Sequence, residues 1–172
     1  MEMGCRSMYQ VGDLIVYGGN GVCRVAAVGP GPRGGRFYTL EPVYQSCTIM
    51  TPVDNQKVFH RPIITRQEAL SLIDDIPTIQ AQAYHSKVMR ELTEHYDAML
   101  KTYDCRSLLE LTMSIYVKRQ DAQSQKRRLG SVDEAFQRKA EDLLFSEPAC
   151  ALDLPREEVQ PFIAARLEGR PS

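Results

Sequence analysis

The first third of the chain carries short apolar runs that are separated by turn residues. Four runs rich in β-branched and aromatic residues predict strands: 11–17, 22–28, 37–41 and 47–53. Glycines and prolines fill the intervening segments 18–21 and 29–35, as is typical of turns. Several short strands at this spacing favour a small barrel, because closing a sheet removes most of its exposed edges. We therefore expect a β-barrel over residues 8–64.

The pattern changes at Thr65-Arg-Gln-Glu68, which matches the capping box S/T-x-x-E. In this motif the hydroxyl and the carboxylate satisfy backbone N–H groups at the start of a helix. The apolar face that follows ends at Asp74-Asp75, and Pro77 comes directly after it. Residues 65–77 are therefore expected to form a short helix and a linker.

Beyond the linker, apolar residues recur at steps of three and four, which indicates helices. Four are expected: about 79–102, 104–130 with Asp104 as N-cap and Gly130 at its end, 131–148 with a capping box at Ser131–Glu134, and one that begins at Pro155. Short connections favour a compact bundle over residues 78–170. The fold class is thus α+β, a small β-barrel followed by an all-α domain.

Composition argues against several classes of site and of location. No stretch among the 172 residues approaches the roughly 20 apolar residues that span a bilayer, and Met1 to Met8 lacks a targeting pattern. The five cysteines form no C-x-x-C pair, and the three histidines lack the spacing of metal ligands. We expect a soluble, cytoplasmic protein without metal or cofactor.

Charge restricts any contact with nucleic acid to a local patch. The formal net charge is −1, and neither half of the chain is basic overall. One run of cations stands out in the helix predicted over 104–130. It consists of Lys118, Arg119, Lys126, Arg127 and Arg128. Steps of seven and eight would place Arg119, Lys126 and Arg127 on one helical face, where they could bind phosphates. Alternatively, these cations form a solvated helix end, where they favour the negative end of the helix dipole.

The opening Val11-Gly-Asp-Leu-Ile-Val-Tyr17, followed by Gly21-Val22, resembles the CarD family and the RNA-polymerase-interacting module of transcription-repair coupling factors. The pattern of that family is V-G-D-x-V-V-Y-x-x-H-G-V, and Asn20 stands where the family usually has histidine. A looser likeness continues from Thr51-Pro52-Val53 into the helical half. The resemblance implies an SH3/Tudor-like barrel followed by a helical domain.

The resemblance also implies a partner, the β subunit of RNA polymerase. Small barrels expose a strand edge, and such an edge can pair with a strand of a partner. Candidate polymerase-binding residues are Arg24, Arg33, Arg36, Ile49, Met50 and Thr51. For the arginines the alternative is that they are solvated turn residues.

For the helical half, the family implies contact with promoter DNA through a tryptophan near the start of the domain. This chain has no tryptophan, and spacing places Met89 near the equivalent position. Methionine can wedge between base steps in proteins that bind the minor groove. Lys87 and Arg90 flank this position and form a second basic patch.

The sequence leaves two functions open. The first is a bacterial transcription regulator that binds RNA polymerase and alters the stability of the promoter open complex, without sequence preference in the DNA. The second is a protein-interaction module that binds polymerase or another partner without touching DNA. An enzyme is not expected, because no nucleophile with a base, phosphate-binding glycine loop or carboxylate pair can be placed in a cleft.

Overall fold

The computed structural model describes residues 9–169, and the chain divides into two compact units, Met1–Ile63 and Ile64–Ser172. Met1 to Met8, where no targeting segment was expected, lies outside the described residues, as does Arg170 at the end of the predicted helical domain. No helix in the described part is long and apolar enough to cross a membrane.

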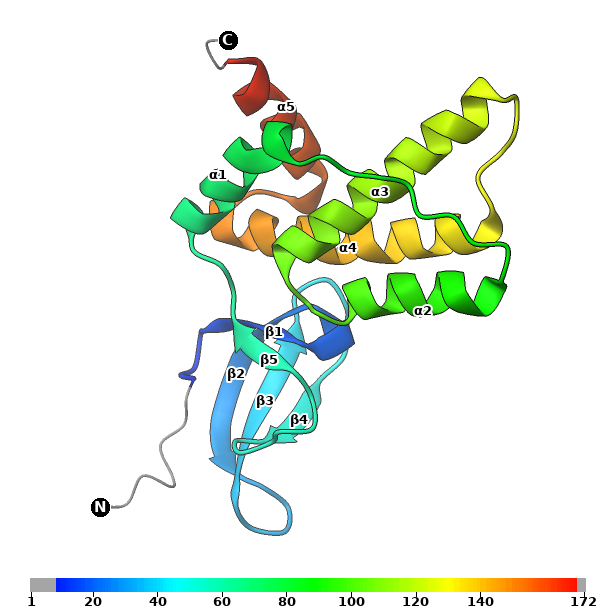
Figure 1. Cartoon of the computed structure of the whole chain (residues 1–172). Helices are drawn as coiled ribbons and strands as arrows, with labels where there is room; N and C mark the ends of the chain where they lie inside the picture. The colour runs from blue at the N-terminus through cyan, green and yellow to red at the C-terminus, as the bar shows by residue number, and fades with distance from the viewer. Residues whose placement is uncertain (1–8, 170–172) are drawn as a thin grey trace. The chain divides into compact units, whose positions relative to one another are not determined.

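The first unit is built on a five-stranded antiparallel sheet (Figure 1). Its strands are β1 (Leu14–Tyr17), β2 (Val22–Pro30), β3 (Arg36–Pro42), β4 (Ile49–Pro52) and β5 (His60–Pro62), in the order β4-β3-β2-β1-β5. The four predicted strands are confirmed, with shifts of up to three residues at their ends. The sequence did not predict β5, because three residues ending in proline are too few to show an alternating pattern.

Side chains connect the two outer strands of this sheet. The Asn55 side chain donates to Thr51 Oγ1 at the end of β4 (2.8 Å), and the Asn55 carbonyl accepts from Nε2 of His60 in β5 (3.1 Å). His60 Nδ1 in turn accepts from the Tyr9 hydroxyl (2.7 Å). Among the described residues, β4 and β5 form no ladder with each other, so these polar contacts tie them together instead.

The second unit consists of helices. They are α1 (Arg66–Asp75), η2 (Ile76–Thr78), α2 (Met89–Leu100), α3 (Cys105–Ser124), α4 (Ser131–Leu152), η3 (Arg156–Glu158) and α5 (Val159–Glu168). One core joins α2, α3 and α4 around the fully buried residues Tyr96, Leu111 and Ile115. A second core joins α1, α4 and α5 around Ile73 and Leu152. A sheet followed by helices confirms the α+β class.

Two of the predicted helix starts have the expected chemistry. Thr65 Oγ1 accepts from the N–H of Glu68 (3.0 Å), and the Glu68 carboxylate accepts from the N–H of Thr65 (3.1 Å). Asp104 caps α3 by accepting from the N–H of Ser107 (3.1 Å). These motifs are local in sequence, which is why the pattern alone could identify them.

The helix predicted over 79–102 is wrong in its first half, because α2 begins only at Met89. Residues 79–88 have no regular secondary structure, and two tertiary contacts fix their course. The Ser114 hydroxyl of α3 donates to the Gln82 carbonyl (2.6 Å), and the Tyr84 ring stacks on His95 of α2 with centroids 3.7 Å apart. The apolar spacing predicted a helix here, but the segment makes these contacts with α2 and α3 instead of helical backbone hydrogen bonds.

The helix predicted to run to Gly130 also ends early, at Ser124. Lys126 adopts a left-handed conformation with φ 58°, and the N–H of Arg127 bonds to the carbonyl of Ala122 (2.7 Å). The N–H of Lys126 bonds to the carbonyl of Gln123 (3.0 Å), which completes a Schellman ending. Glycine usually occupies this left-handed position, so the helix end was not visible in the sequence.

Three other predicted boundaries in the helical unit differ from the structure. The N-cap of α4 is Gly130 and not Ser131, so the expected capping box at Ser131 does not form. α4 also continues through Pro148 to Leu152, because buried contacts hold both sides of the proline: Glu147 accepts from the N–H of Ile64 (2.7 Å), and Ala149 is fully buried. Pro155 lies one residue before η3, and α5 follows from Val159.

Candidate functional site

The outer edge of β4 is the first candidate surface, and Met50 lies at its centre. The N–H of Val53 bonds to the carbonyl of Arg36 (3.0 Å), and the pairing of β4 with β3 continues in the same register. Since hydrogen-bonded pairs alternate along an antiparallel ladder, the N–H and C=O of Met50 point away from β3. The Met50 side chain is also 51% exposed. This edge can accept an additional strand.

The other candidates in the sheet differ in how accessible they are. Arg24 on β2, Arg33 in the β2–β3 connection and Arg36 at the start of β3 are exposed, and Ile49 is half-buried. Thr51 is only 3% exposed, and its hydroxyl accepts from Tyr17 (3.1 Å) and Asn55. Its side chain therefore stabilises the unit internally, and its N–H and C=O point toward Tyr38 of β3, so Thr51 offers a partner strand neither its side chain nor its main chain.

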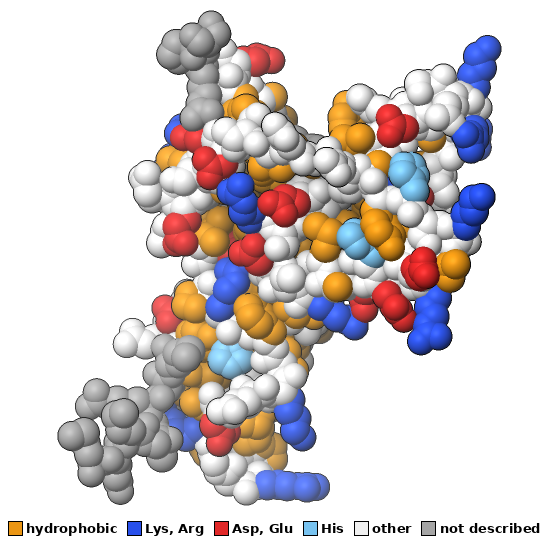
Figure 2. Space-filling model, in the orientation of Figure 1, with side chains coloured by type: hydrophobic (Ala, Val, Ile, Leu, Met, Phe, Trp, Pro, Cys, Tyr) orange, Lys and Arg blue, Asp and Glu red, His pale blue; other side chains and the backbone are white. Residues whose placement is uncertain are grey.

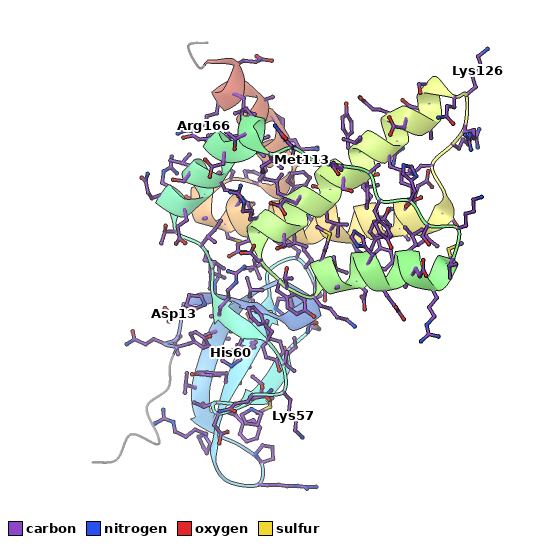
Figure 3. All side chains as sticks on the ribbon, in the orientation of Figure 1. Asp13, Lys57, His60, Met113, Lys126 and Arg166 are labelled. Atoms are coloured by element: carbon purple, nitrogen blue, oxygen red, sulfur yellow. The ribbon has the colours of Figure 1, made fainter. Side chains whose placement is uncertain are left out.

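The second candidate surface is a hollow of about 310 Å³ in the helical unit, between the end of α3 and the start of α4. The cations that line it are Lys118, Arg127 and Arg128, with His85 beside them. Figure 2 shows Lys and Arg side chains along this edge of the unit, and Lys126 projects from the end of α3 in Figure 3. This hollow with its flanking Lys126 is called the basic pocket below.

Lys118 belongs to the run of cations that the sequence singled out, but it was not assigned to the predicted phosphate-binding face, and His85 was not predicted as a site residue. Lys118, Asp121, Ala122 and Gln125 all line the basic pocket, at the spacing of one helical face. The Lys118 ammonium is paired with Asp133 of α4 (2.9 Å), which also accepts from the Tyr96 hydroxyl (2.6 Å). Lys118 is therefore partly neutralised, whereas Arg127, Arg128 and the flanking Lys126 are exposed cations.

Arg119 lies apart from the basic pocket. Its guanidinium donates to the Gln137 side chain of α4, and Arg119 does not line the hollow. The predicted face of Arg119, Lys126 and Arg127 is wrong, since Lys126 and Arg127 follow the end of α3 at Ser124. The structure instead groups Arg127 and Arg128 with Lys118 and His85.

The second predicted patch lies at the same end of the helical unit as the basic pocket. His85 lines the pocket, and Lys87 and Met89 follow it within four residues (Figure 1). Met89 opens α2 and is 60% exposed, and its neighbour Val88 is 51% exposed. Lys87 and Arg90 flank them, although Arg90 also pairs with Glu94 (3.0 Å). Two exposed apolar side chains thus sit between cations.

Tyr84, three residues before Lys87, stacks on His95 of α2, and the burial of His95 predicts a pH effect. Burial lowers the pKa of His95 below its usual value of 6.5, because desolvation disfavours the imidazolium form. As the pH falls below about 6.5, the unfolded chain binds a proton at His95 that the folded chain does not bind, so stability falls. We expect His95→Phe, which keeps the stacking, to flatten the loss of melting temperature between about pH 7.5 and pH 5. Parallel curves for the two proteins would contradict this prediction.

Comparisons with known proteins identify the first unit. Residues 9–64 match the family model described as the CarD-like/TRCF RID domain. No curated protein matches the chain. A domain of this family is an interaction module for RNA polymerase and is not catalytic. The predicted family resemblance is therefore confirmed for this segment: residues 9–64 of the chain form a CarD-like/TRCF RID domain.

Proposed function

We propose that the chain is a bacterial transcription regulator whose first unit binds the β subunit of RNA polymerase along the outer edge of β4. The observation that carries this proposal is the match of residues 9–64 to an RNA-polymerase-interacting family, together with an edge strand whose central residue, Met50, directs its N–H and C=O outward. Main-chain pairing at such an edge provides affinity, and neighbouring side chains provide selectivity. Arg24, Arg33 and Arg36 are proposed as accessory contacts. We also propose that the contacts of Asn55 with Thr51 of β4 and with His60 of β5 close the sheet into an SH3/Tudor-like barrel.

The helical unit is proposed to touch promoter DNA at the end that carries the basic pocket. Arg127, Arg128 and Lys126 would bind backbone phosphates, while Met89 with Val88 would enter the minor groove between Lys87 and Arg90. Contacts made only to melted or bent DNA would stabilise the open complex, because a ligand shifts an equilibrium only by its difference in affinity for the two states. The exposure of these residues and their common location support this proposal.

The double variant Arg127→Ala/Arg128→Ala tests the DNA contact. Each lost phosphate contact lowers the slope of log K against log salt by about 0.9, so a decrease of roughly 1.8 is expected between about 50 and 200 mM salt. Fluorescence anisotropy with a promoter fragment measures it. The variant Arg106→Ala/Arg119→Ala removes the same charge from α3 away from the pocket, and it should leave the slope unchanged.

Lys126→Gly separates the contribution of this residue to stability from its contribution to binding. Glycine adopts the left-handed conformation without strain, so the variant should stabilise the helical unit by about 0.5 to 1 kcal/mol. The same change should weaken DNA binding by removing a cation. A variant that is more stable and binds DNA equally well would show that Lys126 has no role in binding.

The alternative function is an interaction module that does not touch DNA. It would be supported if Arg127→Ala/Arg128→Ala and Lys126→Gly both left DNA affinity and open-complex lifetime unchanged while the chain still bound polymerase.

A further inference from the structure

A third surface of the helical unit, away from the basic pocket, is apolar and concave. It is a hollow of about 300 Å³ whose walls come from one stripe each of α3, α4 and α5, together with Ile76 of η2. α3 contributes Leu109, Thr112, Met113 and Tyr116, which follow the spacing of a single helical face (Figure 3 labels Met113). Tyr116 is 53% exposed although it lies among apolar neighbours. This stripe spans about 10 Å, the length of two helical turns.

One charged group lies in the wall of this hollow, the carboxylate of Glu141 on α4. Within the described part of the chain, no hydrogen bond or ion pair reaches it, and the nearby Arg119 is hydrogen-bonded to Gln137. Burial raises the pKa of Glu141, while Arg119 acts in the opposite direction. An apolar partner would bury this carboxylate further, at a cost that a cation on the partner would offset.

We propose that this hollow is a docking groove for an amphipathic helix of a partner protein that carries a lysine or arginine beside its apolar face. A helix of two to three turns matches the length of the α3 stripe, and anchors at i, i+3 or i+4 and i+7 match grooves formed between helices. The basic residue of the partner would pair with Glu141. The surface shares no residue with the β4 edge or the basic pocket, so this inference does not depend on the proposed function.

The test uses the full chain and two synthetic probes. The probes are helix-stabilised fluorescent peptides of about three turns with leucines at i, i+3, i+4 and i+7, one with an arginine beside the leucines and one with glutamine in its place. The arginine peptide should bind saturably in anisotropy titrations and more tightly than the glutamine peptide. Glu141→Gln should weaken binding of the arginine peptide about fivefold and leave the glutamine peptide unchanged. Asp142→Asn removes the neighbouring charge, which does not line the groove, and should affect neither peptide.

A second variant tests the groove itself. Ala164 is exposed on α5 and lines the hollow, so Ala164→Gln narrows it with a residue that favours helices. It should weaken both peptides about tenfold, with an unchanged circular dichroism melt. The absence of saturable binding, or equal effects of Glu141→Gln and Asp142→Asn, would overturn the proposal. Sedimentation that shows a dimer of the chain, abolished by Ala164→Gln, would also overturn it, because the occupant would then be a second copy.

Discussion

Replacing Met50 with proline is expected to weaken the binding of the chain to RNA polymerase about 100-fold. The N–H of Met50 points away from β3, so proline removes a donor that only a partner strand would use. The proline ring also obstructs the approach of that strand. A lost hydrogen bond and a steric clash together correspond to about 3 kcal/mol, or two decades in affinity. Biolayer interferometry with immobilised polymerase measures this effect.

The control for this prediction is Met50→Ala, which keeps the N–H and removes most of the exposed side chain. It should weaken binding by less than about tenfold, since an exposed rim side chain contributes less than about 1 kcal/mol in most interfaces. Both variants should retain the melting temperature of the parent, because β4 keeps its bonds to β3. Equal losses for the two variants would indicate that the partner recognises the side chain and not the strand edge.

Replacing Asp133 with alanine is expected to destabilise the helical unit by about 3 to 5 kcal/mol. Asp133 has a side chain that is 6% exposed, and its Oδ1 accepts from both Lys118 and Tyr96. Alanine leaves a largely buried ammonium and a buried hydroxyl without this acceptor. Chemical denaturation followed by circular dichroism measures the change in the free energy of unfolding.

Two further variants identify the cause of that loss. Asp121→Ala removes an exposed carboxylate from the same pocket and should change stability by less than about 0.5 kcal/mol. Adding Lys118→Met to Asp133→Ala should recover part of the lost stability, because the uncompensated charge is gone. A double variant as unstable as the sum of its parts would show that Lys118 and Asp133 act independently.

Features set by neighbouring residues were visible in the sequence. The capping box at Thr65 and the N-cap at Asp104 depend on contacts three residues apart, and both form as predicted. The apolar runs of β1 to β4 likewise indicated strands, because alternation and turn residues are local signals. The resemblance of the first strands to the CarD family was equally direct, and the family match confirms it for residues 9–64.

Features set by distant contacts were not visible. Residues 79–88 have apolar spacing compatible with a helix, but they form an irregular segment that contacts Ser114 and His95. Lys126 ends α3 in a conformation that sequence rules reserve for glycine. The grouping of His85 with Lys118, Arg127 and Arg128 joins segments from three parts of the chain, which only the fold could bring together. The burial of Thr51 also depends on a partner outside its strand, Tyr17 of β1.

Amide hydrogen exchange of the full chain, alone and saturated with RNA polymerase, shows whether β4 pairs with a strand of the polymerase. We expect slowed exchange within β4 (Ile49–Pro52), with the Met50 amide among the protected groups, because that N–H would join a strand of the polymerase. Failure to bind polymerase, or protection confined to the helices of the second unit, would contradict this expectation.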